Sequence, residues 1–315
     1  MLRILHGTNY DFIRWWKTAV VLTIAFIVIG LGSLALTGGF DYSIDFTGGT
    51  LLQFDFAKPQ SASDIGRLRA AFDAGGNKGA EIQQFGPATS FTVRAQDKDG
   101  TASAAIEKEV AGVVGKDAFK VGRAETVGPR VGGELRRGAV IAILVSFLFT
   151  LAYLAIRFDW RFGLAAVVAT AHDILTTIAF MKILHLEISL TVIAALLTVI
   201  GYSLNDTIII FDRVRENLRK NRKEPLYDTL NRSVNETLPR SILTHATAFA
   251  ATLALLFFAG AVIRPFAWVM AFGIFTGTFS SIYVASPILL WIEHSYPRVN
   301  EARSVRAVKK VPAKA

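Results

Sequence analysis

Six long apolar stretches dominate the hydrophobic pattern of this 315-residue chain. Because about 20 apolar residues cross a bilayer as a helix, each stretch is long enough to span a membrane. The stretches are Thr18–Phe40, Ala139–Ile156, Phe162–Met181, Ile188–Phe211, Ser241–Ile263 and Phe266–Ile292. The pattern therefore predicts a polytopic α-helical membrane protein with six transmembrane helices.

A segment of different pattern, residues 41–137, separates the first stretch from the second. Its hydrophobic period changes in the order strand, helix, strand, strand, helix, strand. The elements are predicted at Thr50–Phe56, Ala62–Ala74, Ala80–Phe85, Ser90–Gln96, Thr101–Val114 and Phe119–Val127. This β-α-β-β-α-β order is that of the ferredoxin-like sandwich, so we predict a small α+β ferredoxin-like domain between the first and second helices.

The other predicted divisions follow from the six stretches. Residues 1–17 form an N-terminal segment, 18–40 the first transmembrane helix, 138–293 a five-helix transmembrane bundle and 294–315 a basic tail without hydrophobic period. Within the bundle, loop 212–239 is rich in Arg, Asn and Glu. We expect this loop to hold a short amphipathic helix and a turn near Glu224–Pro225.

The composition is 52% hydrophobic with a mean hydropathy of +0.42, which is too apolar for an ordinary soluble domain. The net charge of +9 is concentrated in segments that lie on one side of six spans, whereas the only Lys and Arg residues of the two short loops on the other side are Lys182 and Arg264. Since cytoplasmic loops accumulate Lys and Arg, both termini are predicted to be cytoplasmic and the small domain periplasmic. The charge is therefore interpreted as membrane topology rather than as nucleic-acid binding. The absence of cysteine excludes disulfides.

The fourth stretch contains a single ionisable side chain, Asp206, beside Asn205 and Thr207. A charge at membrane depth costs a few kcal/mol and is usually retained for ion or proton movement. Burial favours the neutral acid and a nearby cation favours the carboxylate, so a carboxyl group between these influences can load and release a proton. The alternative is an Asp–Asn pair that only stabilises helix packing.

Three further polar residues in or beside the stretches are ambiguous. Arg240 follows Pro239 at the start of the fifth stretch, where it is either a snorkelling anchor or a counter-ion to Asp206. Asp173, next to His172 in the third stretch, either joins the proton path or accepts structural hydrogen bonds. No third ligand has a suitable spacing for a metal, so no metal site is predicted.

Glycine pairs flank the small domain. Gly48 and Gly49 lie in the run DFTGGT and permit a tight turn into the first strand, and Gly132 and Gly133 form a matching return. Both pairs are either hinges of a moving domain or plain turns. The run is not a phosphate-binding loop, because it lacks the Lys-Ser/Thr ending and a following helix.

Four motifs carry a family resemblance: GYSLNDTIIIFDRVREN at Gly201–Asn217, DFTGGT at Asp45–Thr50, VGPRVGGELRRGA at Val127–Ala139, and His172–Asp173. The chain resembles the SecF family, the smaller subunits of the SecD–SecF complex in the RND superfamily. The resemblance implies a half-transporter-type protein of the bacterial inner membrane that works with SecD and YajC beside the SecYEG channel. It also implies use of the proton-motive force to draw preproteins across after SecA has begun the task. The family's essential aspartate in the fourth span and arginine at the start of the fifth match Asp206 and Arg240.

Three functions remain open on these grounds. The first is a proton-driven subunit for protein export, and the second is an RND-type proton-coupled half-transporter that exports a small molecule or lipid. The third is a passive scaffold that stabilises membrane partners. The sequence contains no Walker, GxSxG or zincin motif. It therefore gives no support for an enzyme and predicts no cofactor.

Overall fold

The structure, a computed structural model, describes residues 7–77, 80–97, 101–260 and 262–296. Within these residues, six helical segments are long and apolar enough to cross a membrane, and each overlaps one predicted stretch. The prediction of a six-span helical membrane protein is confirmed. Most of the predicted basic tail, from residue 297 onward, and residues 1–6 lie outside the described residues.

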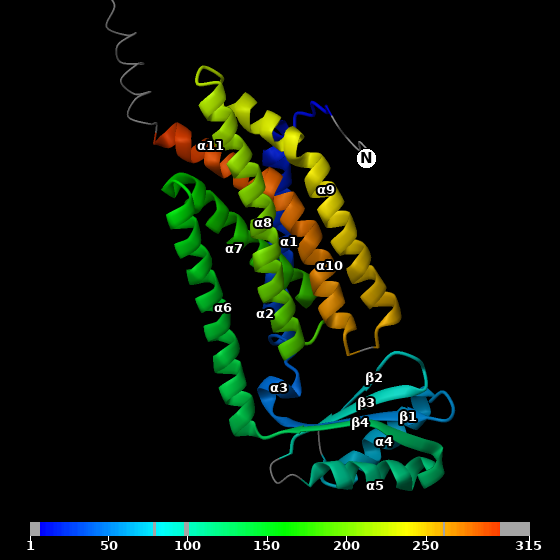
Figure 1. Ribbon diagram of the computed structural model, residues 1–315. Helices are drawn as coiled ribbons and strands as arrows, with labels where there is room; N and C mark the ends of the chain where they lie inside the picture. Colours follow the sequence, from blue (N-terminus) through cyan, green and yellow to red (C-terminus); the bar gives the residue numbers. More distant parts are fainter. Residues whose placement is uncertain (1–6, 78–79, 98–100, 261, 297–315) are drawn as a thin grey trace, which may run out of the picture.

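The first and last spans are each built from several consecutive helical pieces (Figure 1). The first comprises η1 (Ile13–Trp15), α1 (Trp16–Gly32) and α2 (Leu34–Thr37), and the last comprises α10 (Arg264–Ser280), the π-helix η3 (Ser281–Ala285) and α11 (Ser286–Ser295). Between them are α6 (Pro129–Arg157), α7 (Trp160–Ile183), α8 (Leu190–Lys220) and α9 (Leu226–Phe258).

The centre of the bundle is formed by α7, α8 and α10, which bury far more of their side chains than α1, α6 or α9. Glycines permit the close approach of α8 and α10. A Cβ added at Gly273 would overlap the side chain of Val199, and one at Gly277 would lie 3.0 Å from the Cβ of Ser203. Small residues of this kind let backbones approach closely within a bilayer, where packing rather than water drives helix association.

The helices α8 and α9 extend beyond their apolar stretches and meet at a turn formed by residues 221–225. The turn lies near Glu224–Pro225, as expected, but in place of a separate short helix the rest of segment 212–239 continues α8 and α9. We call this end of the molecule the hairpin end. The start of α1 and the end of α11 lie at the same end, and the small domain lies at the opposite end (Figure 1).

The small domain is a four-stranded sheet with strand order β2-β3-β1-β4, in which every neighbouring pair is antiparallel. Its elements are β1 (Gly49–Phe56), α4 (Ala62–Ala74), β2 (Glu81–Gln84), β3 (Ser90–Ala95), α5 (Ala102–Val114), η2 (Lys116–Ala118) and β4 (Phe119–Val127). The predicted ferredoxin-like order is confirmed. Figure 1 shows α4 and α5 on the sheet face that points away from the spanning helices.

Alternation along β1 determines which sheet face is buried. Leu52, Phe54 and Phe56 point toward α4 and α5 and contribute to one apolar core with Phe72 of α4 and Ile106 of α5. Each such side chain contributes roughly 1.5–3 kcal/mol on burial. The opposite face, which carries the intervening polar residues of the strands, is turned toward the membrane bundle.

The chain enters and leaves the small domain at one place. Gly48 and Gly49 have φ values of 72° and 125°, and a Cβ at Gly48 would lie 2.8 Å from the Cα of Pro129. Gly132 and Gly133 do not form the predicted return turn, because α6 already begins at Pro129, a residue favoured in the first turn of a helix. Instead, Gly132 is buried where α6 meets the segment before Gly48.

Candidate intramembrane polar site

Asp206 lies on α8 inside the bundle, and its side chain is buried. Its Oδ1 accepts a hydrogen bond of 2.6 Å from the hydroxyl of Ser241 on α9. Its Oδ2 is buried and has no hydrogen-bond donor among the described residues. An ionised carboxylate with one donor is incompletely compensated, since burial of a charge is costly unless the charge is paired and hydrogen-bonded.

The surroundings of Asp206 contain two basic groups on α9. Arg240 precedes Ser241 and lies within electrostatic range of Asp206. His245, one turn after Ser241, is buried, and its ring lies 5.2 Å from the ring of Tyr202. The fourth and fifth spans therefore pack together as the counter-ion interpretation requires.

Asp173 occupies a different environment at the centre of the bundle. It is 1% exposed, and its Oδ2 accepts hydrogen bonds from Ser203 of α8 and from Ser280 of α10 at 2.7 Å. Its Oδ1 lies 3.1 Å from Nδ1 of the adjacent His172. This carboxyl group therefore joins three central helices, and it is much better satisfied than that of Asp206.

Thr207 adds a second link between α8 and the last span. Its hydroxyl lies 2.8 Å from the hydroxyl of Ser281, and both side chains are buried. Ser281 is the first residue of η3, and single turns of π-helix are frequent at functional sites. By contrast, Asn205 is exposed on α8 and is not brought into this cluster.

The sequence did not identify the hydroxyl partners of the two acids. Ser203, Ser241 and Ser280 are ordinary hydroxyl residues of spanning helices, and only the packing of α7, α8, α9 and α10 shows that each meets a carboxyl group. The predicted residues Asp206, Thr207 and Asp173 lie in this region of the bundle. The glycine pairs lie at the small-domain end instead.

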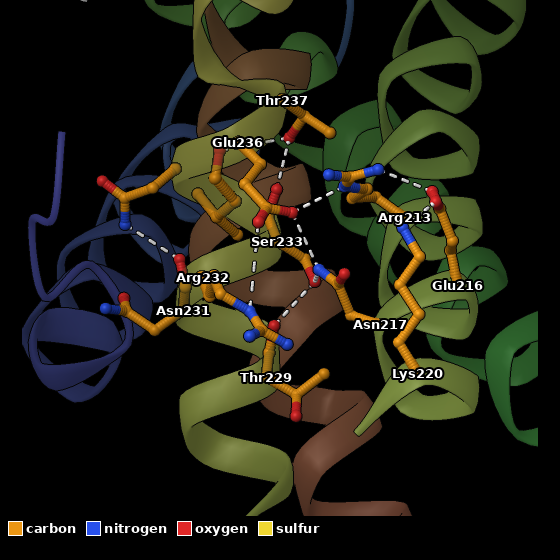
Figure 2. Close-up of polar contacts among 12 residues, drawn as sticks. Arg213, Glu216, Asn217, Lys220, Thr229, Asn231, Arg232, Ser233, Glu236 and Thr237 are labelled. Carbon is orange, nitrogen blue, oxygen red and sulfur yellow. Dashed lines mark hydrogen bonds and ion pairs between the residues drawn. The ribbon is translucent and has the colours of Figure 1, made fainter. Parts of the chain in front are cut away.

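A polar network at the hairpin end fixes α8 against α9 (Figure 2). Nε of Arg213 lies 2.5 Å from Oε2 of Glu236, and Asn217 donates to the same oxygen at 2.8 Å. Asn217 also donates to Ser233 at 3.0 Å. Arg213 follows Asp206 by two helical turns, so these contacts help to hold the Asp206–Ser241 pair in register.

The fold and this site define a class of protein: a polytopic membrane protein with one ferredoxin-like domain after its first span and carboxyl groups buried between its spanning helices. The chain matches the family model for the C-terminal region of the protein export membrane proteins SecD and SecF over residues 106–295. It also matches the SecD/SecF GG motif over residues 34–60. The chain belongs to the SecD/SecF family of protein export membrane proteins.

Individual relatives support the same assignment. The protein translocase subunit SecF of Gemmatimonas aurantiaca is 58% identical over 98% of this chain and 95% of its own length. That of Vibrio alginolyticus is 41% identical over 94% of this chain and 96% of its own length. The resemblance to SecF that was predicted from the four motifs is confirmed.

A solved structure shows the same fold. The crystal structure of SecDF, a translocon-associated membrane protein from Thermus thermophilus, matches with a TM-score of 0.84 and 37% identity over 93% of this chain. The match covers 40% of that protein, so the chain spans about two fifths of the SecDF chain.

Proposed function

We propose that this chain is the SecF-type subunit of a membrane complex that uses the proton-motive force to promote protein export. Its membership of the SecD/SecF family supports a role in protein export. The second part of the proposal is that export is coupled to proton movement through the chain. It rests on Asp206, a buried carboxyl group inside a spanning helix that has a single hydrogen-bond donor and one unpaired oxygen within the described part of the chain.

The roles of the polar residues differ in this proposal. Asp206 binds and releases the proton, Ser241 orients its carboxyl group, and Arg240 is the cation that stabilises the ionised state. Thr207 links α8 to the π-helix, which adjusts when the charge of its neighbour changes. Asp173, with three polar partners, is better suited to holding α7, α8 and α10 together than to exchanging protons.

The available driving energy is sufficient for such a role. One charge that moves across 100 mV releases about 2.3 kcal/mol, which shifts a two-state equilibrium nearly fifty-fold. One or two protons per cycle therefore suffice to bias the packing of α8 against its neighbours.

A SecD-like membrane subunit is the expected partner. The related SecDF protein contains a further part beyond the two fifths matched here. Gly201 and Asn205 on α8 and Thr244 on α9 are exposed in the isolated chain at the depth of the bundle. Transporters commonly place the working site between two pseudosymmetric halves, so a SecD-like half is proposed to cover this polar face.

The remaining partners and the orientation belong to the same proposal. The chain would lie in the bacterial inner membrane with both termini cytoplasmic and the small domain periplasmic, as the basic residues indicate. It would act with SecYEG and SecA, with YajC as an accessory subunit, on a preprotein that emerges near the small domain.

The test replaces Asp206 by asparagine, which preserves the shape of the side chain and removes its ionisation. Membrane vesicles that contain the complex are assayed for preprotein export with and without a proton gradient. Asp206→Asn is expected to abolish the stimulation by the gradient. The matched control is Asp212→Asn, the same change at an exposed carboxyl group on the same helix, which is expected to export normally.

Full gradient-dependent export by Asp206→Asn would refute the proton-coupling proposal. If neutralising Asp206 left export intact while partner levels depended on the presence of the chain, the passive scaffold would be favoured. A specific efflux defect with normal secretion in a deletion strain would favour the small-molecule or lipid exporter.

A further inference from the structure

The small domain contacts the spanning helices at a point distant in sequence from its own linkers. Tyr42 forms a parallel β-bridge with Ile188, which lies in the loop between α7 and α8. The amide of Ser43 donates to the carbonyl of Ile188 at 2.9 Å, and the amide of Ile188 donates to the carbonyl of Asp41 at 2.7 Å. Ile188 is therefore hydrogen-bonded through both its amide and its carbonyl to the segment that leads into the small domain.

Arg94 adds a side-chain contact from the sheet itself. It lies on β3, where it alternates with the core residue Val93 and so points away from α4 and α5, and it forms an ion pair with Glu187 in the same loop. It also donates to the carbonyl of Tyr42 at 3.2 Å and to Glu81 of β2 at 3.4 Å. One partly buried guanidinium thus joins the sheet, the entry segment and the loop between α7 and α8.

Asp45 completes the junction at the start of α8. Its Oδ2 accepts a hydrogen bond of 2.9 Å from the amide of Leu190, the first residue of that helix. A carboxylate at a helix N-terminus satisfies an otherwise unpaired amide and complements the helix dipole. At the end of α7, buried Lys182 lies 3.6 Å from Asp41. The two helices that carry Asp173 and Asp206 are therefore both held at their small-domain ends.

We propose that Arg94, Glu187 and Asp45 are positioning residues of a strut that transmits movement of α7 and α8 to the small domain. The proposal rests on the proposed function, in which protonation of Asp206 shifts these helices. The helix between Leu190 and Asp206 is continuous, so a shift at the acid is carried over about 24 Å to the junction. All three contacts involve the short segment that connects α7 to α8: the Arg94–Glu187 ion pair, the Asp45 helix cap and the Tyr42–Ile188 β-bridge. Together they oppose movement of this segment relative to the sheet.

The test reverses the charge of Glu187 in the complex with its SecD-like partner. Glu187→Arg opposes Arg94 across the junction, and we expect gradient-dependent export to fall about fivefold, the factor at the upper end of what one such ion pair contributes. Gradient-driven proton flux in proteoliposomes is expected to persist, because Asp206 is untouched. The matched control is Glu107→Arg, the same change at an exposed carboxylate of α5, which lies within the small domain on the sheet face away from Arg94 and is expected to export normally.

A second variant keeps the result interpretable if Glu187→Arg fails to accumulate. Arg94→Glu combined with Glu187→Arg restores opposite charges across the junction and is expected to recover export. The strut proposal would be refuted if Glu187→Arg exported as well as the unmodified complex, or if Glu107→Arg lost export equally. Loss of proton flux together with export in Glu187→Arg would also refute it. The proposal would also be refuted if the double variant Arg94→Glu/Glu187→Arg accumulated normally but did not export.

The Asp206→Asn variant, assayed in parallel, separates this inference from the proposed function. If Asp206→Asn loses gradient-dependent export and Glu187→Arg keeps it, the strut is wrong and proton coupling stands. If Asp206→Asn keeps full export, proton coupling itself is wrong.

Discussion

Replacing Asp173 by alanine and by asparagine distinguishes a structural hydrogen-bond acceptor from a proton carrier. Alanine removes the acceptor shared by Ser203 and Ser280 and the contact with His172. At about 0.6–1 kcal/mol for each of three contacts, we expect the free energy of unfolding to fall by about 2–3 kcal/mol. Asparagine keeps an oxygen for the two serines and presents an amide to His172, so its cost is expected to stay below about 1 kcal/mol.

The assay follows unfolding of the purified chain in detergent through its tryptophan fluorescence, and export is measured on the same variants with and without a proton gradient. Asp173→Asn is expected to unfold nearly as the unmodified chain does and to retain gradient-dependent export. Asp173→Ala is expected to unfold earlier and to export less, in proportion to the loss of folded protein.

Two results would contradict this reasoning about Asp173. If asparagine destabilised the chain as much as alanine, hydrogen-bond acceptance would not be what the carboxyl group contributes. If Asp173→Asn remained stable but lost its response to the gradient, Asp173 would belong to the proton path rather than to a structural cross-link.

Two further predictions concern packing and pH. Gly277→Leu is expected to separate α10 from Ser203 and destabilise the bundle by about 1–3 kcal/mol in the same unfolding assay. Gly201→Leu, at a position where an added Cβ would meet no neighbouring atom within 4 Å, should have little effect in the purified chain, and equal effects would refute the packing argument. In the small domain, hydrogen bonds from Ser61 and Arg67 lower the pKa of Asp64 to about 2. The stability that this carboxylate gives α4 is therefore present above the unfolded pKa of 3.8 and is lost as the pH falls toward 2. Hydrogen exchange of the α4 amides measures this loss. Unchanged protection of these amides through that pH range, or the same pH response in Ser61→Ala, would contradict the prediction.

The elements were predictable because they depend on local periodicity. The apolar stretches are long, and the alternation of Leu52, Phe54 and Phe56 fixes both the strand and its buried face. Asp206 was identifiable because a carboxyl group in an apolar helix is rare. In each case the signal lies within a few neighbouring residues.

The residues that sequence reasoning missed depend on packing between distant helices. Ser241 and Ser280 look like ordinary hydroxyl residues of spanning helices, which commonly bond to their own backbone. The ion pair between Arg94 and Glu187 joins a strand to a loop in the membrane bundle, and no pattern in either segment indicates the other. Gly132 was interpreted as a turn residue because glycine permits turns, but it equally permits close packing of a helix.

The length of α8 has a geometric consequence outside the membrane. With 31 residues the helix is about 46 Å long, whereas the hydrocarbon core of a bilayer is about 30 Å thick. Its last residue, Lys220, lies about 21 Å along the axis from Asp206. A rotation of α8 by about 10° about Asp206 would displace the end of the helix sideways by about 4 Å. The helix therefore acts as a lever, because a small rearrangement within the lipid becomes a larger displacement where a neighbouring protein can contact the helix.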